Sequence, residues 1–514
     1  MTEARAADAR GRRRSRDPAQ AEIRRPDYRR LRNPFTPQRV FSDDRVAAIH
    51  AAALRVLQEL GIRVLLPEAR RLFAGAGALV DEYTGLVRIG GEIVAAALAC
   101  APKSFVAHAG EPARDVVFEI GALSFLAGCG APNVTDLARG RRPGSQADLE
   151  DLIRLAHSFD ALHLLGPFVE AQDVANPLRH YAFSRAQLTL SDKLPCINAR
   201  GTPQTHDCFE LVRLARGLSE SEFADAAYCY TVINTNSPRQ LDIPMAQGLI
   251  DFARAGQISI VTPFCLAGAM APITVAGALT LQHAEALAGI ALAQIVRPGA
   301  PVVYGSFSSN VDMKSGSPAF GTPEHVKATL GAGQLARFIG LPWRSGAGAA
   351  SPAPDVQGAQ ETLFGLCGSL IAGASVCIHA AGWLEGGLSV SFEKWITDME
   401  AVQTIAELCA GAPEDDDAIG FDAIAEVAPG GHFFAAAHTM SRYRTAFYEP
   451  IVADLSNHGN WTQSGAKTAT ERASEVWRRR IAEHQPPPSA VRAAEAIDPF
   501  IARRSAEGGA APVS

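Results

Sequence analysis

Residues 301–361 read PVVYGSFSSNVDMKSGSPAFGTPEHVKATLGAGQLARFIGLPWRSGAGAASPAPDVQGAQE. The apolar run 301–304 predicts a strand, which ends in a polar loop rich in glycine and serine. Residues 322–324, Thr-Pro-Glu, then supply the cap, the first-turn proline and the early acid of a helix. A second short strand is expected at 341–343, and the loop after it ends at 355–357. The stretch therefore predicts two strand–loop–helix units whose loops have the composition of a functional site.

The same alternation recurs from about residue 120 onwards. Apolar runs end in loops rich in Gly, Ser, Asn or Pro, and helical patterns follow them. The runs lie 31–43 residues apart, which is about the length of one strand–helix unit. They begin near Leu123, Leu162, Leu194, Ala227, Ile258, Pro301, Leu341 and Ala374. Eight such units predict an α/β fold, the (β/α)8 TIM barrel. A doubly wound open sheet is the alternative, but no run is followed by its G-x-G-x-x-G turn.

The remaining segments are expected to surround this barrel. Residues 1–34 are predicted to be a disordered, arginine-rich tail, and 35–118 to be an N-terminal helical accessory layer. The barrel is assigned to 119–400. A helical C-terminal extension that packs on the barrel is assigned to 401–484. The last residues, 485–514, are rich in Pro and Ala and are expected to be loosely ordered.

The composition is that of an ordinary soluble globular protein, with 47% hydrophobic and 20% charged residues. The net charge of −6 is unevenly distributed. Residues 1–32 carry eleven Arg and five acidic residues, so the rest of the chain carries −12. This body has no basic stripe, which argues against a nucleic-acid partner. The basic tail is interpreted as a solvated segment, or alternatively as a docking tail for an acidic partner.

A cytoplasmic location is expected. No apolar segment of a Sec or twin-arginine signal follows the basic start. The apolar run 277–296 is interrupted by Gln282, His283 and Glu285, which argues against a membrane span. The nine cysteines include no C-x-x-C pair and are interpreted as reduced thiols. No Cys or His set has the spacing of a zinc site, so no metal is expected.

The active site of such a barrel lies at the carboxyl ends of its strands. Several aromatic residues fall there or just beyond: Tyr304, Phe307, Trp343, Trp383 and Trp395. A cage of rings beside a carboxylate holds a quaternary ammonium ion, which cannot donate a hydrogen bond. Simple core packing is the alternative for any single ring. His379, near the end of the last run, is either a polar site residue or a satisfied core histidine.

Five segments carry a family resemblance when they are taken together. They are Tyr304-Gly-Ser with Asp312-Met-Lys-Ser-Gly316, Gly321-Thr-Pro-Glu324, Asp355-Val-Gln357, Ser391-Phe-Glu-Lys394 with Asp398 and Glu400, and Gly430-Gly-His432 with His438-Thr439. In these segments, and from Arg32 to Trp461 overall, the chain resembles the trimethylamine:corrinoid methyltransferase superfamily. The resemblance implies a (β/α)8 barrel. It also implies transfer of a methyl group from a methylated amine to the Co(I) of a corrinoid held on a separate small protein.

The chain departs from this pattern in two places. It contains only standard residues, so it resembles the branch that lacks pyrrolysine, which includes glycine betaine and other quaternary-amine demethylases. A quaternary nitrogen has no lone pair to add to the pyrrolysine imine, and its leaving group is a neutral tertiary amine that needs no general acid. Many relatives also read Thr-Asp-x-Lys where this chain has Ala349-Ala-Ser-Pro352. The substrate is therefore left open among small methylated amines, with trimethylamine as the weaker candidate.

We expect substrate-binding roles for several of these residues and assign no catalytic residue. The aromatic residues Tyr304, Phe307, Trp343 and Trp383 would hold the cation, with His379 beside them. Asp355 and Gln357, with Glu385 or Glu393, would orient the cation or its carboxylate end. Arg200 or Arg344 would pair with a substrate carboxylate in bidentate fashion.

The corrinoid is expected to come from a partner protein. The chain lacks the D-x-H-x-x-G sequence that binds corrinoids, because none of its thirteen His has Asp two places before it. We also expect a homo-oligomer, with no membrane partner. Two other functions stay open: a non-catalytic amine-binding paralogue, and an unrelated TIM-barrel lyase or hydrolase. The latter would need a metal or a Schiff-base lysine at a strand end, and Lys314 and Lys394 are the nearest lysines.

Overall fold

A computed structural model describes residues 27–513 of the chain. Contacts divide the chain into two compact units. One consists of Tyr28–Cys409 with Pro450–Ser514, and the other of Met1–Asp27 with Ala410–Glu449. Residues 1–26 of the tail expected over 1–34 lie outside the described residues. Within the part of that tail that is described, Leu31–Arg32 form strand β1.

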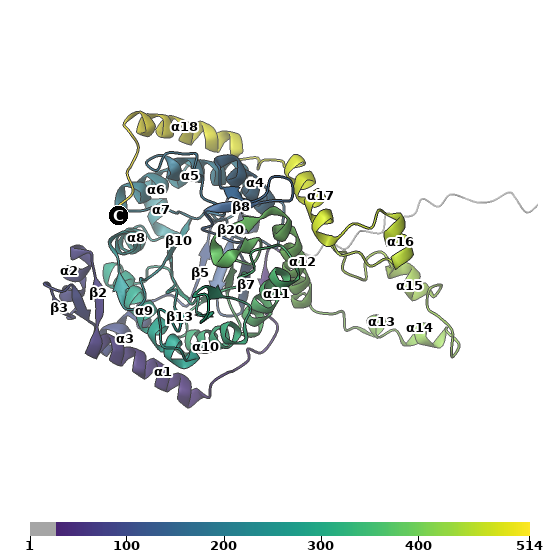
Figure 1. The fold of residues 1–514 in the computed structure, drawn as a ribbon, viewed down its shortest axis with the longest axis horizontal. Coiled ribbons are helices and arrows are strands. Elements are labelled where there is room, and N and C mark those ends of the chain that lie inside the picture. Colours follow the sequence, from purple (N-terminus) through teal and green to yellow (C-terminus); the bar gives the residue numbers. More distant parts are fainter. Residues whose placement is uncertain (1–26, 514) are drawn as a thin grey trace, which may run out of the picture. The chain divides into compact units, whose positions relative to one another are not determined.

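Six parallel strands form the centre of the larger unit (Figure 1). Their order is β7–β18–β17–β14–β12–β10, and β1 pairs with β7 in antiparallel fashion. The strands span Ala122–Phe125 (β7), Tyr230–Ile233 (β10), Ile258–Val261 (β12), Val302–Gly305 (β14), Trp343–Gly346 (β17) and Val376–Ile378 (β18). Each falls within one of the apolar runs of the sequence. The predicted α/β architecture is confirmed.

The two remaining runs form single β-bridges instead of full strands. The parallel bridges join Leu164 to Leu194 and Cys196 to Tyr230. The backbone N–H of His163 also donates to the carbonyl oxygen of Phe125 in β7, at 2.9 Å. Proline limits the pairing here, because Pro195 has no N–H to donate to a ladder.

Helices lie around these strands within the larger unit (Figure 1). Two of the predicted caps are present. Ser145 Oγ accepts the backbone N–H of Asp148 at 3.2 Å, and Thr322 Oγ1 accepts that of His325 at 3.1 Å. The helices are α4 (Gln146–His157), α5 (Arg179–Leu190), α6 (Thr202–Arg216), α7 (Glu220–Asp225), α8 (Ile243–Arg254), α9 (Val275–Val296), α10 (Pro323–Ile339), α11 (Val356–Ile371) and α12 (Phe392–Cys409).

Helix α9 is a buried core helix. Within residues 27–513 it is the one helix whose length and composition would allow a membrane span, and 78% of its apolar window is buried inside the structure. The polar residues that interrupt it have partners inside the protein. Gln282 Nε2 donates to the carbonyl oxygen of Gly305 at 2.8 Å, and a ring nitrogen of His283 lies 3.0 Å from the hydroxyl oxygen of Tyr304. These polar side chains therefore fix α9 against β14.

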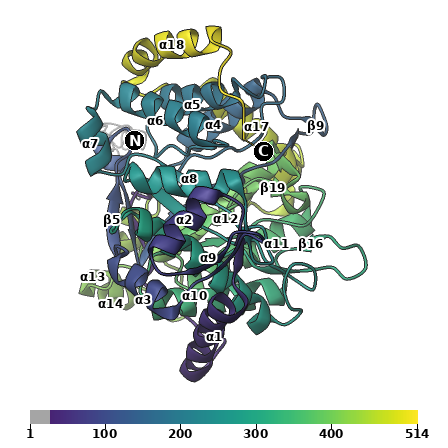
Figure 2. The same ribbon diagram turned by 90° about the vertical axis from the view of Figure 1, so that its left-hand side faces the viewer.

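An N-terminal layer covers α8 and α9 (Figure 2). Its four-stranded sheet has the order β11–β2–β4–β3, and α1, α2 and α3 contact α9. The elements are α1 (Asp43–Arg55), a π-helical turn (Val56–Leu60), β2 (Ile62–Val64), α2 (Pro67–Gly75), β3 (Leu79–Asp81), β4 (Leu86–Arg88), α3 (Gly91–Cys100), β11 (Gln240–Leu241) and the hairpin β5 (Ser104–Ala107) and β6 (Val116–Glu119).

Two small sheets follow the carboxyl ends of the central strands. One has the order β13–β15–β16 and the other β19–β20–β8–β9. Their strands are β8 (Asn133–Thr135), β9 (Arg142–Pro143), β13 (Leu266–Ala267), β15 (Ser309–Val311), β16 (Pro318–Ala319), β19 (Trp383–Leu384) and β20 (Ser389–Ser391). The loops that the sequence marks as functional therefore carry structure of their own.

The C-terminal part of the chain is more regular than the sequence suggests. Helix α12 runs through the expected boundary at residue 400, and α16 (His458–Gln463) and α17 (Ala469–Ala482) follow. The stretch 485–514, expected to be loosely ordered, instead contains helix α18 (Ala490–Ala506). Ala493 and Ile497 of this helix are buried, four residues apart on one face. Pro499 lies inside the helix and hides this pattern in the sequence.

The smaller unit is described over Asp27 and Ala410–Glu449. It contains three short helices, α13 (Asp416–Ile419), α14 (Phe421–Ala425) and α15 (Ala437–Arg442). An ion pair between Arg442 and Asp417 connects α15 to α13. Several of its large hydrophobic side chains, including Phe421, Phe434 and Phe447, are exposed.

We predict that the protein loses stability as the pH falls from about 6.5 to 4. Burial lowers the pKa of His163 from 6.5 to about 4, so the folded state keeps this ring neutral. Its Nδ1 accepts the backbone N–H of Phe125 at 3.0 Å, and its Nε2 lies 2.9 Å from the carbonyl oxygen of Tyr28. The unfolded chain takes up a proton in this window and the folded chain does not, which costs about 3 kcal/mol at pH 4.

The measurement is the urea unfolding midpoint of wild type and His163→Asn between pH 4 and pH 7. Asn keeps an acceptor toward Phe125 and cannot titrate, so the variant should lose less stability on acidification. Burial also lowers the pKa of His325 to about 4 and that of His283 to about 3, so some pH dependence should remain. Equal pH dependence in the two proteins would contradict the prediction.

Candidate active site

A cavity of about 660 Å³ opens at the carboxyl ends of the central strands. Each of the eight apolar runs contributes at least one lining side chain. In chain order these include Cys129, Pro167, Asn198, Asn234, Phe264, Phe307, Arg344 and His379. The position expected for the active site therefore coincides with a cavity that all eight segments build together.

One wall of the cavity is aromatic. The ring of Phe307 lies 5.6 Å from Trp383, 4.9 Å from His379 and 5.3 Å from Phe264, measured between centroids. His379 stacks on Trp383 at 4.3 Å. Phe320 packs behind Phe307 and Trp383 and buries their outer faces. The arrangement presents several ring faces and edges to one space, as the binding of a methylated ammonium group requires.

The indole ring of Trp383 is held in place by two glycines. A Cβ at Gly348 would lie 2.2 Å from the ring, and a Cβ at Gly387 would lie 2.5 Å from it. Both glycines also have positive φ, +104° and +107°. The indole N–H donates to the carbonyl oxygen of Cys129 at 3.2 Å. These glycines therefore explain how the loop brings a large ring to the cavity wall in one orientation.

Arg344 is the most unusual side chain in the cavity. It is 2% exposed, and its guanidinium carbon lies 4.7 Å above the centroid of Phe307. No carboxylate within the described residues lies within ion-pairing distance of it, and Nε has no hydrogen-bond partner there. The one hydrogen bond of its side chain to another described residue, from Nη1 to the carbonyl oxygen of Ser306, is long at 3.4 Å. Burial lowers the pKa of Arg344 to about 10, which still leaves it charged at neutral pH. A buried cation without a counter-ion is costly, which indicates an anionic ligand.

His379 adds a neutral donor beside this cation. Burial, with the charge of Arg344 as a further cause, holds the pKa of His379 well below 6.5. Its Nδ1 faces the backbone N–H of Cys129 at 3.3 Å and therefore acts as an acceptor, which places the ring proton on Nε2. His379 also has a positive φ of 60°, a strained conformation for this residue type. The loop thus holds a neutral imidazole at the cavity, with its Nε2–H available to a ligand.

The cavity carries positive charge and no compensating acid. Arg200 and Arg344 line it, and no Asp or Glu within the described residues does. Within residues 27–513, no group of three or more His, Cys, Asp or Glu side chains is arranged to hold a metal ion. A ligand with a carboxylate would therefore complement this cavity better than a simple cation.

A buried acid outside the cavity shapes one of its loops. Glu285 of α9 accepts hydrogen bonds from Thr235 Oγ1 at 2.5 Å, Ser237 Oγ at 2.6 Å and the backbone N–H of Arg239 at 2.7 Å. Thr235 and Ser237 belong to the loop after β10, which lines the cavity. Sequence reasoning missed this role because Glu285 lies within an apolar helix. No signal in the sequence connects it to a loop fifty residues earlier.

Residues 8–509 match the family described as trimethylamine methyltransferase (MTTB). The chain belongs to this family. The glycine betaine methyltransferase of Desulfitobacterium hafniense strain Y51 is 33% identical over 472 residues, which cover 91% of this chain and 98% of that protein. The trimethylamine methyltransferase MttB of Desulfitobacterium hafniense strain DSM 10664 / DCB-2 is 28% identical over 92% of this chain and 95% of its own length. Membership makes the chain a methyltransferase.

A solved structure aligns more weakly. The monomethylamine methyltransferase MtmB of Methanosarcina barkeri covers 87% of this chain and 95% of its own length, with a TM-score of 0.45 and 10% identity.

Two of the aromatic residues that were expected at the active site of this methyltransferase lie outside the cavity. Tyr304 and Trp343 are fully buried and face the helices. Tyr304 meets His283 of α9, and the indole N–H of Trp343 donates to the carbonyl oxygen of Gly373 at 2.7 Å. Strand geometry explains both placements, because successive side chains point to opposite faces. Arg344, next to Trp343, therefore points into the cavity instead.

The four acidic and amide candidates also lie outside the cavity lining. Asp355 is exposed and caps α11 by accepting the backbone N–H of Gly358, and Gln357 donates to Glu361. Glu385 forms a two-bond ion pair with Arg141. Glu393 is buried, where one carboxylate oxygen accepts from Ser474 Oγ at 2.9 Å and from the indole N–H of Trp477 at 3.0 Å. Of the predicted site residues, the cavity brings together Phe307, His379, Trp383, Arg200 and Arg344.

Proposed function

We propose that this chain transfers a methyl group from a small quaternary amine to the Co(I) of a corrinoid held by a partner protein. The family match supports the methyl transfer, and the chain's similarity to a glycine betaine and a trimethylamine methyltransferase supports a methylated amine as donor. The corrinoid is the methyl acceptor and hence a co-substrate. The absence of D-x-H-x-x-G from the sequence supports its supply by another protein. Cytoplasmic location and homo-oligomeric assembly remain predictions.

We further propose that residues 119–400 close as a (β/α)8 barrel. The six strands account for six of its eight positions, and the bridges at 164–194 and 196–230 support the other two. The hydrogen bond from His163 to Phe125 supports closure between the first and second units. The accessory layer at 35–118 would pack on its outside, as would residues 401–409 and 450–484 of the extension, which belong to the same unit.

One observation carries the choice of substrate: among the described residues, the cavity combines aromatic rings with a buried Arg344 that has no carboxylate partner, and no Asp or Glu lines it. A simple methylammonium ion would meet two guanidinium groups, Arg200 and Arg344, with no counter-charge. A betaine brings its own carboxylate. Arg344 and the Nε2–H of His379 would hold that carboxylate, while Trp383, Phe264 and Phe307 would face the methylated nitrogen.

The proposed methyl transfer requires no acid or base from the side chains. The cobalt(I) electron pair forms the new bond to the methyl carbon as the carbon–nitrogen bond breaks. The nitrogen keeps that bonding pair and leaves as a neutral tertiary amine, so no proton has to move. A neutral His379 and the absence of an acid in the cavity suit such a step. Rate enhancement would come from orientation of the methyl group and exclusion of water.

The test mixes the chain with a reduced corrinoid protein and a panel of glycine betaine, carnitine, proline betaine and trimethylamine. We expect the Co(I) absorbance to convert to that of methyl-Co(III) with a betaine, and more slowly or not at all with trimethylamine. The demethylated amine should appear in equal amount. Binding of betaines without any spectral change would favour the non-catalytic amine-binding paralogue and would contradict this proposal.

A further inference from the structure

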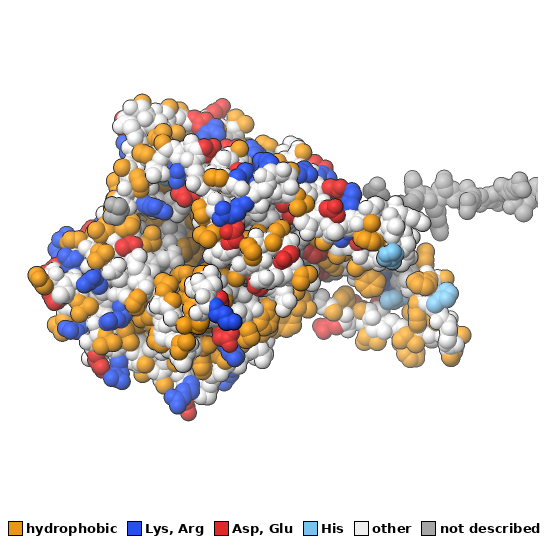
Figure 3. Space-filling view, viewed as in Figure 1, with side chains coloured by type: hydrophobic (Ala, Val, Ile, Leu, Met, Phe, Trp, Pro, Cys, Tyr) orange, Lys and Arg blue, Asp and Glu red, His pale blue; other side chains and the backbone are white. Residues whose placement is uncertain are grey.

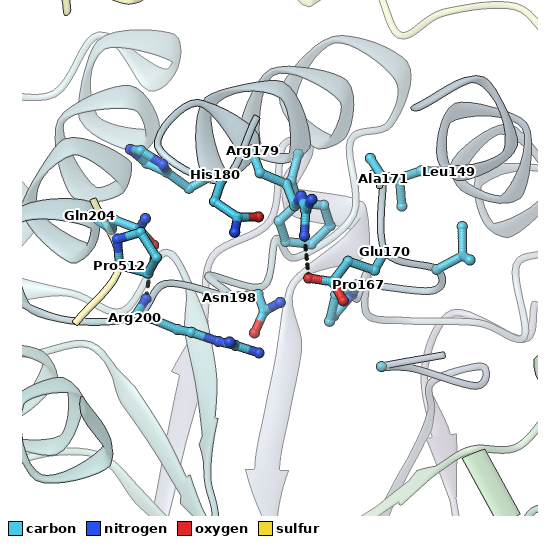
Figure 4. Close-up of a pocket in the computed structure, with 14 residues that line it drawn as sticks. Leu149, Pro167, Glu170, Ala171, Arg179, His180, Asn198, Arg200, Gln204 and Pro512 are labelled. Carbon is cyan, nitrogen blue, oxygen red and sulfur yellow. Dashed lines mark hydrogen bonds and ion pairs between the residues drawn. The ribbon is translucent and has the colours of Figure 1, made fainter. Parts of the chain in front are cut away.

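A second cavity of about 330 Å³ adjoins the first one. The two share Gly130, Pro167, Asn198 and Arg200, which we call the lip. Figure 4 shows Asn198 and Arg200 pointing toward the ion pair of Glu170 and Arg179 across this second cavity. Asn198 and Arg200 of the lip follow the bridge segment 194–196, so the second cavity opens at the same end of the central strands as the first.

The second cavity mixes hydrogen-bond donors and acceptors. Arg200 offers donors, Glu170 offers acceptors, and the amide groups of Asn176 and Asn198 offer both. Arg179 donates to Glu170 and to the carbonyl oxygen of Val174, so its charge is compensated. A site for a simple anion would not place a carboxylate here, and a site for a simple cation would not place guanidinium groups. The mixture suits a neutral group that both donates and accepts, such as a primary carboxamide.

The walls of this cavity are apolar where the polar groups leave room. Leu149, Val169, Ala171 and Phe183 line it. A ligand that carries its carboxamide on a short aliphatic stem would contact these side chains with its methylene groups. The corrin ring bears primary carboxamides on acetamide and propionamide stems around its edge, and thus has the required chemistry.

Away from the lip, the surface beyond the carboxyl ends of the strands is more apolar. Figure 3 shows hydrophobic side chains gathered over β13, α10 and α11 on the face that it draws. Exposed apolar residues beyond the strand ends include Ile273, Met313, Val356 and Leu388. Ile273 and Met313 lie together beside Gly268. The lip therefore concentrates polar groups that can bind carboxamides at a rim that is otherwise rich in apolar side chains.

The C-terminal segment 508–513 fixes the lip. The backbone N–H of Val513 donates to the carbonyl oxygen of Arg200 at 3.0 Å. The side chain of Gln204 bridges the two segments, because it accepts the backbone N–H of Arg200 at 3.0 Å and donates to the carbonyl oxygen of Ala510 at 2.8 Å. Figure 4 shows Pro512 beside Arg200 and Gln204. Contacts with Ala510 and Val513 therefore position Arg200.

We propose that the second cavity is the acceptor subsite, in which Asn198 and Arg200 bind carboxamide side chains of the corrin ring while the methyl donor occupies the first cavity. The proposal rests on the proposed function. It assigns Arg200 to the acceptor and leaves Arg344 to the carboxylate of the donor. This division predicts that replacing Arg200 mainly weakens binding of the corrin, and that replacing Arg344 mainly weakens binding of the methyl donor.

The experiment measures direct binding, separately from turnover. Equilibrium dialysis with cobinamide, a corrin that keeps the carboxamides and lacks the nucleotide tail, is carried out in the presence of glycine betaine. Arg200→Met and Asn198→Ala should each weaken cobinamide binding about tenfold and weaken glycine betaine binding by a much smaller factor, because both residues also line the first cavity but Arg344 holds the carboxylate there. Arg344→Met should show the opposite pattern. Arg45→Met, an exposed position on α1, is the control for an equal change in charge.

Two further measurements test whether the carboxamides and the position of Arg200 determine cobinamide binding. Cobyrinic acid heptamethyl ester, whose side chains cannot donate hydrogen bonds, should bind more weakly than cobinamide. A chain that ends at Glu507 keeps α18, which Arg504 ties to Asp207, and should weaken cobinamide binding like Arg200→Met. The proposal is overturned if the wild type does not bind cobinamide, if both lip variants bind it normally, or if the ester binds equally well. Normal cobinamide binding without methyl transfer from any betaine would instead refute the proposed function and leave the subsite in place.

Discussion

Replacing Arg344 by Met is expected to weaken binding of glycine betaine by at least about 30-fold and, at the same time, to stabilise the ligand-free protein. Arg344 is 2% exposed, and its guanidinium group has no carboxylate partner within the described residues. Removing one member of a buried, hydrogen-bonded charge pair costs roughly 2–5 kcal/mol of binding free energy. Without ligand the same charge is buried and unpaired, so an apolar side chain of similar length should raise the free energy of unfolding by roughly 1–4 kcal/mol.

Binding is measured by isothermal titration calorimetry and stability by urea unfolding. Tetramethylammonium serves as a matched ligand, because it keeps the methylated cation and lacks the carboxylate. Arg344→Met should bind tetramethylammonium as tightly as the wild type or more tightly. The ratio of glycine betaine affinity to tetramethylammonium affinity should therefore fall. Arg344→Lys keeps the charge without the two parallel donors and should fall between the other two proteins. Unchanged glycine betaine affinity in Arg344→Met would show that the carboxylate binds elsewhere.

Strand and helix periodicity predicted the architecture well, but it could not orient individual side chains. The eight apolar runs coincide with the six strands and the two bridge segments, and all eight supply cavity residues. Tyr304 and Trp343 lie outside the cavity lining, because a shift of one residue along a strand moves a side chain to the other face. Phe307, Trp383 and His379 follow the strand ends, and these three do reach the cavity. The register that separates the two groups depends on pairing between strands, which one sequence does not reveal.

The residues that carry the family resemblance mostly stabilise loops and helix ends. Asp312 accepts hydrogen bonds from Ser315 in an exposed turn, and Asp355 caps α11. Glu400 accepts the backbone N–H groups of residues 451–453, which connects the chain after the smaller unit to α12. Acidic residues in loops suggest a cation site when only the sequence is known. The contacts instead explain these three as partners of backbone N–H groups, and no acid within residues 27–513 lines the cavity.

The segment Ala349–Pro352, where the sequence departs from the pattern described above, lies beside the aromatic wall of the cavity. Ala350 packs against the cluster of Phe307, Phe320 and Trp383. The carbonyl oxygens of Ala349 and Ser351 accept backbone N–H groups from residues 386 and 385, beside the loop that carries Trp383. A segment of small residues lets this loop close on the aromatic wall. No Asp or Glu of the described residues lines the cavity beside this wall, which supports the proposal that the ligand brings the compensating charge.

Replacing Asp398 by Asn is expected to lower the free energy of unfolding by about 3–5 kcal/mol, because it leaves Lys394 charged and unpaired in the core. The side chains of Lys394 and Asp398 are 1% and 3% exposed, and Nζ lies 2.7 Å and 2.8 Å from the two carboxylate oxygens. Lys394 also donates to the carbonyl oxygen of Gly358 and to Thr362 Oγ1 of α11. Asp398 accepts the backbone N–H of Gly382, next to Trp383. The pair therefore connects α12 to α11 and to the cavity loop.

The measurement is urea unfolding followed by tryptophan fluorescence, for Asp398→Asn, Lys394→Met and the double variant Lys394→Met/Asp398→Leu. The double variant should be less destabilised than Asp398→Asn, because it leaves no unpaired charge in the core. The matched control is Glu59→Gln, which breaks the ion pair of Glu59 with Arg55 at the same spacing of four residues on an exposed surface and should change stability little. Loss of methyl transfer by Asp398→Asn with an unchanged unfolding midpoint would assign this residue to the chemistry. An early unfolding transition, with methyl transfer recovered at low temperature, would assign it to the fold that holds Trp383 at the cavity.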